Sequence, residues 1–213
     1  MTESLNLVVV SAGLRQPSST RLLADRLAAS TERALDNQGR AAQVQVIELR
    51  ELATDIAHNL VTGFPNETLS EALKAVESAD GLIVVSPIFS ASYSGLFKSF
   101  FDLIDPVALS GTPVLIAATG GSVRHSLALE HALRPLFAYL HATVVPTGVY
   151  AATEDWGASS SAGGTASADL GGRIDRAATE LAALLTTGLA TQRRQRPSED
   201  FDDVVPFEEL LRG

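Results

Sequence analysis

Three short segments of the chain combine small, hydroxyl-bearing and glycine residues in the manner of ligand-binding loops. The first, Ser11–Thr20, carries serine and threonine hydroxyls and the guanidinium of Arg15, and it leads into a helix-length segment. Free amides at a helix N-terminus, assisted by such side chains, suit a terminal phosphate. The simpler role for Ser18 or Ser19 is to cap the helix. The loop lacks the dinucleotide and nucleoside-triphosphate motifs, which disfavours both of those sites.

The second and third segments are suited to form the edges of a slot for a planar ligand. Their candidate contact residues are Pro87, Ile88, Phe89 and Ser90 in the second segment, and Thr119, Gly120, Gly121 and Ser122 in the third. A turn of small residues with exposed apolar side chains can hold the edge of an aromatic ligand. Two consecutive glycines let the backbone approach a ligand closely. Phe89 and Tyr93 would fit a core or an interface equally well. Together the three segments predict a phosphate clamp and two backbone edges.

These segments are expected to meet because each follows an apolar run typical of a buried parallel strand. The runs are Leu5–Val10, Leu82–Val85, Val114–Ala118 and Thr143–Val149, with a weaker alternating run at Val44–Ile47. The helix-length segments between and after them are Ser19–Gln38, Thr68–Ser78, Ser94–Ile104, His125–Leu140 and Leu170–Leu189. The alternation predicts an α/β, flavodoxin-like three-layer sandwich with a five-stranded parallel sheet in the order 2-1-3-4-5. Ligands bind such sheets beyond the carboxyl ends of the strands.

Composition predicts one domain and disfavours several classes of partner. The 213 residues include 16 Lys and Arg and 25 Asp and Glu, for a formal net charge of −9, and no cysteine. The charge opposes binding to nucleic acid, and the absence of thiols excludes disulfides and thiolate chemistry in this chain. No long apolar segment indicates a membrane span, and no His or carboxylate spacing indicates a metal site. We expect a cytoplasmic protein that binds neither nucleic acid nor membrane, with one domain over residues 1–190.

Two segments lie outside the alternation of strands and helices. Residues 151–172 are rich in Ser, Ala and Gly, and we expect a mobile loop there. Residues 191–213 form a charged C-terminal tail that also carries apolar side chains. This tail either docks on a surface or a partner, or it is a frayed terminus.

A proline interrupts the helix expected at His125–Leu140. Pro135 cannot donate a hydrogen bond to the carbonyl of His131, so the helical ladder must open or bulge there. A π-bulge is one way to relieve the clash, and such bulges often occur at functional sites. An ordinary proline kink with a solvated His131 is the alternative.

Taken together, these motifs resemble the NADPH-dependent FMN reductase family, in particular the reductase components of two-component alkanesulfonate or methanesulfonate monooxygenase systems. The resemblance covers about residues 5–150. It is carried by Ser11–Thr20, by Ala79–Lys98 with its Ser-Pro-Ile-Phe and Tyr-Ser-Gly motifs, and by Ala118–Ser122 followed by Leu127–Pro135. The first loop departs from the usual family form, because Gly13 stands where a serine often does and one residue fewer precedes the helix.

The resemblance implies that the protein binds FMN and that the flavin accepts hydride from NADPH or NADH, without a catalytic acid or base from the protein. It assigns the FMN phosphate to Ser11, Arg15, Ser18, Ser19 and Thr20, the flanks of the isoalloxazine to Pro87, Ile88, Phe89 and Ser90, and its pyrimidine side to Thr119, Gly120, Gly121 and Ser122. Arg124 and His125 are candidates for contacting the nicotinamide nucleotide. It further implies a homodimer or homotetramer with His131 and Pro135 at a subunit contact, and a flavin-dependent monooxygenase as partner.

Three other functions are compatible with the same residues. A quinone or azo-compound reductase would differ only in what accepts electrons from the flavin. A flavodoxin-type electron carrier shares the fold and the cofactor. A carrier usually covers both flavin faces with aromatic side chains, whereas this slot offers mainly Phe89, with Tyr93 and Trp156 as weaker candidates. An open flavin face favours a nucleotide substrate. A flavin-binding module without turnover would keep the same loops.

Overall fold

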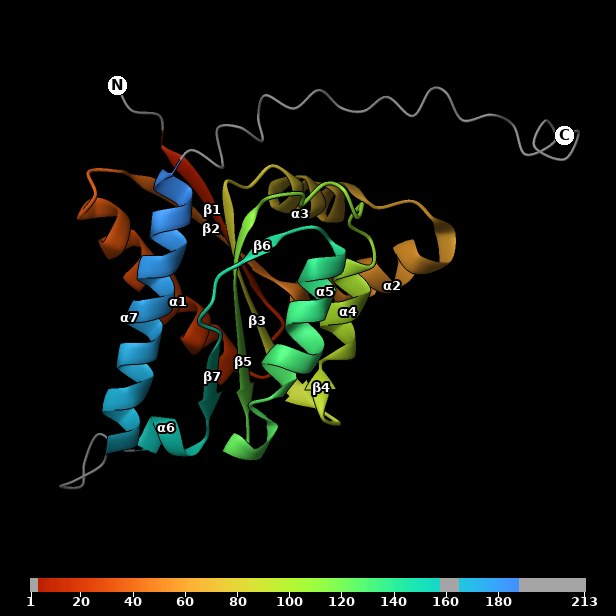
Figure 1. Cartoon of the computed structure of the whole chain (residues 1–213). Coiled ribbons are helices and arrows are strands. Elements are labelled where there is room, and N and C mark those ends of the chain that lie inside the picture. The colour runs from red at the N-terminus through yellow and green to blue at the C-terminus, as the bar shows by residue number, and fades with distance from the viewer. Residues whose placement is uncertain (1–3, 158–164, 188–213) are drawn as a thin grey trace, which may run out of the picture.

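The computed structural model describes residues 4–157 and 165–187, and a parallel sheet lies there between two layers of helices (Figure 1). The strands are β1 Leu5–Ser11, β2 Ala42–Glu48, β3 Gly81–Phe89, β4 Ser92–Tyr93, β5 Pro113–Gly120, β6 Thr143–Val144 and β7 Val149–Ala152. The helices are α1 Ser19–Asp36, η1 Leu49–Leu52, α2 Ala53–Thr62, α3 Glu67–Glu77, α4 Gly95–Phe101, η2 Val123–His125, η3 Leu129–Leu133, α5 Arg134–Tyr139, α6 Glu154–Gly157 and α7 Thr165–Thr186. In these ranges no helix has both the length and the apolar character that crossing a bilayer requires.

The order of the sheet brings the ends of β1, β3 and β5 together. The path runs β2-β1-β3-β5-β6, with β7 also paired to β5, and all of these pairings are parallel. Ser11 at the end of β1 is in register with Val85, and Ser86 is in register with Ala118. The α/β class and the flavodoxin-like parallel sheet are therefore as predicted, and the loops after β1, β3 and β5 share one edge of the sheet.

The sheet differs in detail from the five strands predicted, because the run Thr143–Val149 is divided. β6 and β7 pair with different parts of β5, and the chain leaves the ladder between them. Pro146 lies in this gap and has no amide hydrogen to donate to a neighbouring strand. β4 is the other addition, a two-residue antiparallel partner of β3. The sheet of the described residues thus contains seven strands.

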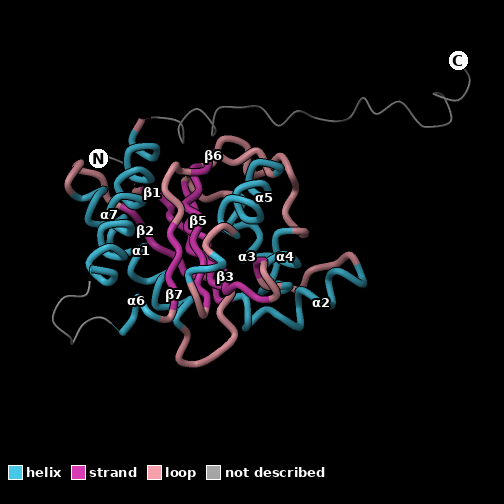
Figure 2. The backbone as a smooth tube through the Cα atoms, turned by 60° about the horizontal axis from the view of Figure 1, so that its bottom comes forward, coloured by secondary structure: helices cyan, strands magenta, loops and turns pink. Residues whose placement is uncertain are grey.

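The core lies on both faces of the sheet because successive residues of a buried strand point to opposite sides. Val8 and Val10 belong to the apolar cluster that includes α3, α4 and α5, whereas Leu7 and Val9 belong to the cluster with α1 and α7. Figure 2 shows the same division, with α1 and α7 on one side of the strands and α3, α4 and α5 on the other. Both faces of the strands that carry the site are therefore packed.

The segment 151–172, for which a mobile loop was predicted, contains regular secondary structure in its described part. The chain continues in β7 to Ala152, forms α6, and enters α7 at Thr165. Asp155 is buried; its carboxylate accepts a hydrogen bond from the amide of Ala152 at 2.7 Å and pairs with Arg173 at 3.2 Å. These bonds order a stretch whose composition indicates disorder. Residues 158–164 and the predicted tail at 191–213 lie outside the described residues.

Two helical features differ from the sequence pattern. The segment that contains η1 and α2 was not predicted, although Leu49, Leu52 and Ile56 are buried there. The helix expected at His125–Leu140 is divided into η2, the π-helix η3 and α5. The amide of Arg134 donates to the carbonyl of Leu129, five residues earlier, so of the two alternatives at the proline the structure contains the π-helix.

Phe137 provides a test of the packing that supports this end of the sheet. Its ring is fully buried, with centroids 5.0 Å from Phe101 and 6.3 Å from Phe97. We expect Phe137→Ala to lower the free energy of unfolding by about 3–5 kcal/mol, because it removes buried area and leaves a cavity. Urea denaturation followed by circular dichroism measures the change.

The matched control is Tyr139→Ala, two residues later in the same helix. Tyr139 is 69% exposed, so its loss should change the free energy of unfolding by no more than about 0.5 kcal/mol. Equal losses in the two variants would contradict the packing described here.

Candidate functional site

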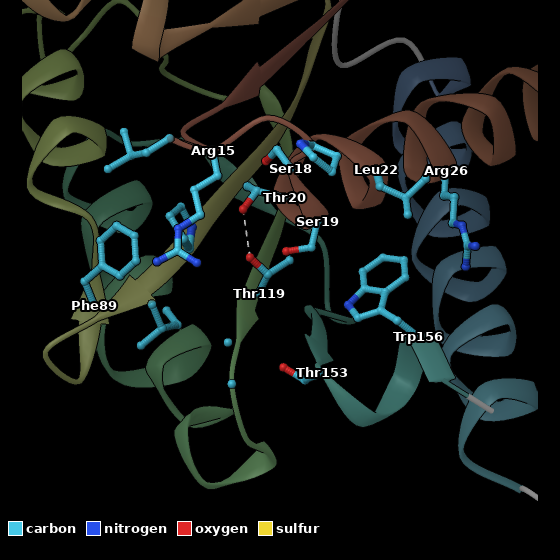
Figure 3. A pocket seen from close by; sticks show the side chains of 16 residues that line it. Arg15, Ser18, Ser19, Thr20, Leu22, Arg26, Phe89, Thr119, Thr153 and Trp156 are labelled. Carbon is cyan, nitrogen blue, oxygen red and sulfur yellow. Dashed lines mark hydrogen bonds between the residues drawn. The ribbon is translucent and has the colours of Figure 1, made fainter.

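A pocket of about 1020 Å³ opens at the shared edge of β1, β3 and β5 (Figure 3). The predicted residues that line it are Arg15, Ser18, Ser19, Thr20, Pro87, Ile88, Phe89, Thr119, Gly120 and Gly121. The lining residues that were not predicted as contacts are Leu14, Pro17, Leu22, Arg26, Thr153 and Trp156. The three predicted segments therefore meet in one cavity, and α1 and the β7–α6 connection complete it.

The first segment places helix-end amides at the pocket. Ser18 is the N-cap of α1: its Oγ accepts from the amide of Arg21 at 3.1 Å, and its carbonyl accepts from Leu22 at 3.0 Å. The amides of Ser19 and Thr20 precede this first bond of the ladder, so they face outward without an intrahelical acceptor. A Cβ at Gly13 would lie 2.1 Å from Ser18 Oγ. Glycine is thus required there for the cap to form.

Buried hydroxyl groups connect this helix end to the sheet. Thr20 Oγ1 and Thr119 Oγ1 are 2.8 Å apart in a buried hydrogen bond, drawn in Figure 3, which joins the start of α1 to the end of β5. Ser11, at the end of β1, is also buried, and its Oγ has no hydrogen-bond partner among the described residues. A buried hydroxyl usually has a hydrogen-bond partner, and a polar ligand at the end of β1 would supply one.

The second segment is a tight hairpin that presents Phe89. Ile88 pairs with Tyr93 and Phe89 with Ser92, and the turn between them consists of Ser90 and Ala91. Both turn residues have positive φ, 48° and 68°, as a type I′ turn requires. This left-handed backbone costs a residue other than glycine about 1 kcal/mol or more. The hairpin holds Phe89, 48% exposed, at one end of the pocket.

The third segment is held in place by Tyr150 of β7. Its hydroxyl donates to the carbonyl of Ser122 at 2.8 Å and lies so close to Gly120 that a Cβ there would be 2.0 Å away. Burial, and to a lesser degree the negative charge of Asp155, raises the pKa of Tyr150 above its ordinary value. The group therefore stays protonated and able to donate at neutral pH. Glycine at position 120 is a packing requirement as well as a way to bring backbone close to a ligand.

Several predicted residues lie outside the pocket lining. Ser11 is buried beneath it and Ser90 is exposed in the hairpin turn, while Ser122 caps η2 by accepting from the amide of Arg124 at 3.2 Å. The side chains of Arg124 and His125 in η2, and of His131 and Pro135 near η3, are exposed. Leu22 and Arg26 follow Ser19 at helical spacing, so the sequence could have predicted that this face of α1 lines the pocket. The sequence offered Trp156 only as a further aromatic candidate for the slot, and no motif assigned it to the pocket.

Charge at the pocket is positive although the chain as a whole is acidic. Arg15 and Arg26 line it, and neither makes an ion pair with a carboxylate among residues 4–157 and 165–187. Arg21, between them on α1, pairs with both Asp25 and Glu48. Two uncompensated guanidiniums in one pocket favour a phosphorylated ligand.

The fit to FMN follows from these features. A phosphate would find the free amides at the start of α1 and the guanidinium of Arg15 in the pocket lining, and the unpaired hydroxyl of Ser11 is buried at the end of β1. A flat ring would find the Phe89 hairpin on one edge and the backbone of Gly120 and Gly121 on the other (Figure 3). The residues present therefore suit a flavin mononucleotide.

The interlock of Gly120 and Tyr150 predicts strong coupling between the two positions. Gly120→Ala should displace the phenol and lower the free energy of unfolding by about 1–3 kcal/mol, and Tyr150→Phe should lower it by about 1 kcal/mol through the lost hydrogen bond. The double variant should lose less free energy of unfolding than the two single losses added together, because the phenylalanine removes the oxygen that clashes with the new Cβ. Urea unfolding of all four proteins measures the coupling, and strictly additive losses would contradict it.

Proteins of known family that resemble this chain are FMN reductases, in agreement with the flavin-shaped pocket. The sequence model of the NADPH-dependent FMN reductase family matches residues 5–157. The chain is 44% identical over 156 residues to an FMN reductase (NADPH) of Pseudomonas aeruginosa, covering 73% of this chain and 81% of that protein. It is 42% identical over 153 residues to the NADH-dependent FMN reductase SfnF of Pseudomonas putida, covering 72% and 80%.

Solved structures agree as well. The crystal structure of an oxidoreductase from Corynebacterium diphtheriae superposes with a TM-score of 0.82 at 48% identity, covering 87% of this chain and 99% of that one. The match to the family model includes the loops after β1, β3 and β5 that form the pocket. This protein belongs to the NADPH-dependent FMN reductase family.

Proposed function

We propose that the protein is an NAD(P)H-dependent FMN reductase of the cytoplasm that supplies reduced flavin to a flavin-dependent monooxygenase. The observation that carries the proposal is one pocket with a phosphate-binding helix end and a flat slot, in a chain of this family. When bound, FMN accepts a hydride from the nicotinamide and a proton from solvent, which gives NAD(P)⁺ and the two-electron-reduced flavin. The protein supplies binding and orientation.

Each part of the pocket has a role in this proposal. The amides of Ser19 and Thr20, with Arg15 and the hydroxyl of Ser11, hold the phosphate. The hairpin with Phe89 and the loop that Tyr150 fixes grip the two edges of the ring, with Ser90 and Ser122 at their rims. Thr20 and Thr119 set the distance between phosphate and ring through their hydrogen bond.

An open flavin face favours a reductase over an electron carrier. Phe89 and Trp156 are the aromatic residues of the pocket lining, and they lie at its opposite ends (Figure 3). A ring held beside Phe89 would keep one face uncovered, and a nicotinamide needs that face for hydride transfer. Arg124 and His125 are exposed in η2, shortly after Gly120 and Gly121, and in this proposal they contact the nucleotide at its rim.

Arg15 tests the phosphate assignment. We expect Arg15→Ala to raise the KM for FMN about tenfold or more, because a charge-assisted contact contributes about 1.5–3 kcal/mol. The KM for riboflavin, which has no phosphate, should change little. NADPH oxidation followed by absorbance measures both, with Arg33→Ala on the exposed side of α1 as control. Equal losses with the two flavins would overturn the assignment.

The same assay tests the choice of acceptor. NADPH or NADH oxidation should be faster with added FMN than with a quinone or an azo dye. If purified protein retains FMN stoichiometrically and quinones turn over much faster than free FMN, the quinone reductase function replaces the present one.

We also propose that the protein is a homo-oligomer, a dimer or a tetramer, with His131 and Pro135 near a subunit contact. The support is the exposed apolar surface near the π-helix, which includes Val123 and Leu127. Sedimentation velocity of the wild type and of His131→Ala, with and without FMN, should show an oligomer that the substitution weakens. A wild-type monomer under all conditions would rule out this role for His131.

A further inference from the structure

The pocket extends beyond the helix end to which the phosphate is assigned. Leu22, Arg26, Thr153 and Trp156 form this extension, here named the Trp156 lobe. In Figure 3 the Trp156 lobe and Phe89 lie at opposite ends of the pocket, and Ser18, Ser19, Thr20 and Thr119 lie between them. A flavin with its ring at Phe89 and its phosphate at α1 would therefore end where the lobe begins.

The dimensions of the lobe leave room for more than FMN. Arg26 follows Ser19 by seven residues, which at 1.5 Å per residue places it about 10 Å farther along α1. Leu22 and Arg26 are four residues apart, so both lie on the same face of the helix. The pocket volume of about 1020 Å³ is at the upper end of the range of roughly 300–1,000 Å³ that holds one drug-sized ligand. The pocket as a whole therefore suits a ligand longer than one mononucleotide.

The side chains of the lobe suit a purine nucleotide. The guanidinium of Arg26 stands over the indole of Trp156, 5.0 Å from the ring centroid, and makes no ion pair with a described carboxylate. Leu22 is 43% exposed and adds apolar surface, while Thr153 is exposed and offers a hydroxyl. Nucleic-acid bases stack on aromatic rings and on guanidinium planes, and stacking on an aromatic ring contributes about 1–3 kcal/mol of binding free energy per base. The face of the Arg26 guanidinium stacks on the indole, and the N–H groups at its edge can donate to a phosphate.

We propose that the Trp156 lobe binds the AMP moiety of a dinucleotide. The adenine lies against the Trp156–Arg26 pair and Leu22, and its phosphate lies between Arg26 and the start of α1. The proposal rests on the flavin orientation given under the proposed function. Two dinucleotides carry this moiety: FAD, whose flavin half would lie where FMN lies, and NAD(P)H.

Binding of AMP itself provides a test that does not depend on activity. Trp156 is the only tryptophan of the chain, so its fluorescence reports directly on the lobe. AMP added to the flavin-free full-length protein should change this fluorescence in a saturable way, with a heat of binding in calorimetry. Arg26→Ala should weaken AMP binding about tenfold or more, as expected for loss of a contact to a charged phosphate.

The matched control is Arg33→Ala, which removes an exposed arginine of the same helix. Arg33 lies outside the pocket lining and pairs with Asp175 at 3.5 Å, so its loss should leave the affinity for AMP unchanged. If AMP gives neither a fluorescence change nor a heat with the wild type, or if both arginine variants bind AMP as the wild type does, the proposal is overturned.

Steady-state kinetics of Trp156→Leu then distinguish the two sources of the moiety. A loss of kcat/KM that is at least fivefold larger with FAD than with FMN assigns the lobe to FAD. A rise in the KM for NADPH at saturating FMN, with equal kcat/KM losses for FMN and FAD, assigns the lobe to the reductant. Equal losses of kcat/KM for FMN, FAD and NADPH overturn the proposal. A wild type that binds AMP but oxidises no NADPH with FMN contradicts the proposed function and leaves the AMP site standing.

Discussion

The parallel pairing of β3 between β1 and β5 is the constraint on which the rest of the site depends. Parallel neighbours end at the same edge of a sheet, and the register of Ser11 with Val85 and of Ser86 with Ala118 brings three connecting loops together there. The hydrogen bond between Thr20 and Thr119 then fixes the start of α1 against the end of β5. The position of a helix end, rather than of any single reactive side chain, therefore sets where an anion can bind.

An acidic chain that binds an anionic ligand must keep its positive charge local. The net charge of −9 repels phosphates. At ordinary ionic strength, however, salt screens this repulsion at distances beyond about 10 Å. At shorter range the amides of α1 and the guanidiniums of Arg15 and Arg26 dominate, since neither arginine is neutralised by a described carboxylate. By contrast, Arg50 and Arg134 pair with acidic neighbours outside the pocket.

Much of this arrangement could be predicted from the sequence, because strands buried on both faces are continuous apolar runs and their loops are rich in Ser and Gly. The failures came where tertiary contacts outweigh local composition. Pro146 divides the last strand, and Asp155 orders a stretch that is rich in small residues. The Trp156 side of the pocket exists only because α6 and α1 meet in space, which no local pattern records. Gly120 was predicted as a ligand contact, yet the hydroxyl of Tyr150 alone already requires glycine there.

Different parts of the fold hold the two ends of the pocket in place. Phe89 lies on a hairpin whose turn residues are in the left-handed region, so its position depends on local hydrogen bonds such as the one from the amide of Ser94 to Ser86 Oγ at 3.0 Å. Trp156 lies one residue after Asp155, which is bonded to Arg173 of α7 at 3.2 Å, and α7 packs against α1 in the same apolar cluster. The position of the Trp156 indole is therefore linked to the packing of two helices, whereas that of Phe89 is linked to one short hairpin. A ligand that contacts both ends would couple the hairpin to the α1–α7 layer through the Thr20–Thr119 bond at the centre of the pocket.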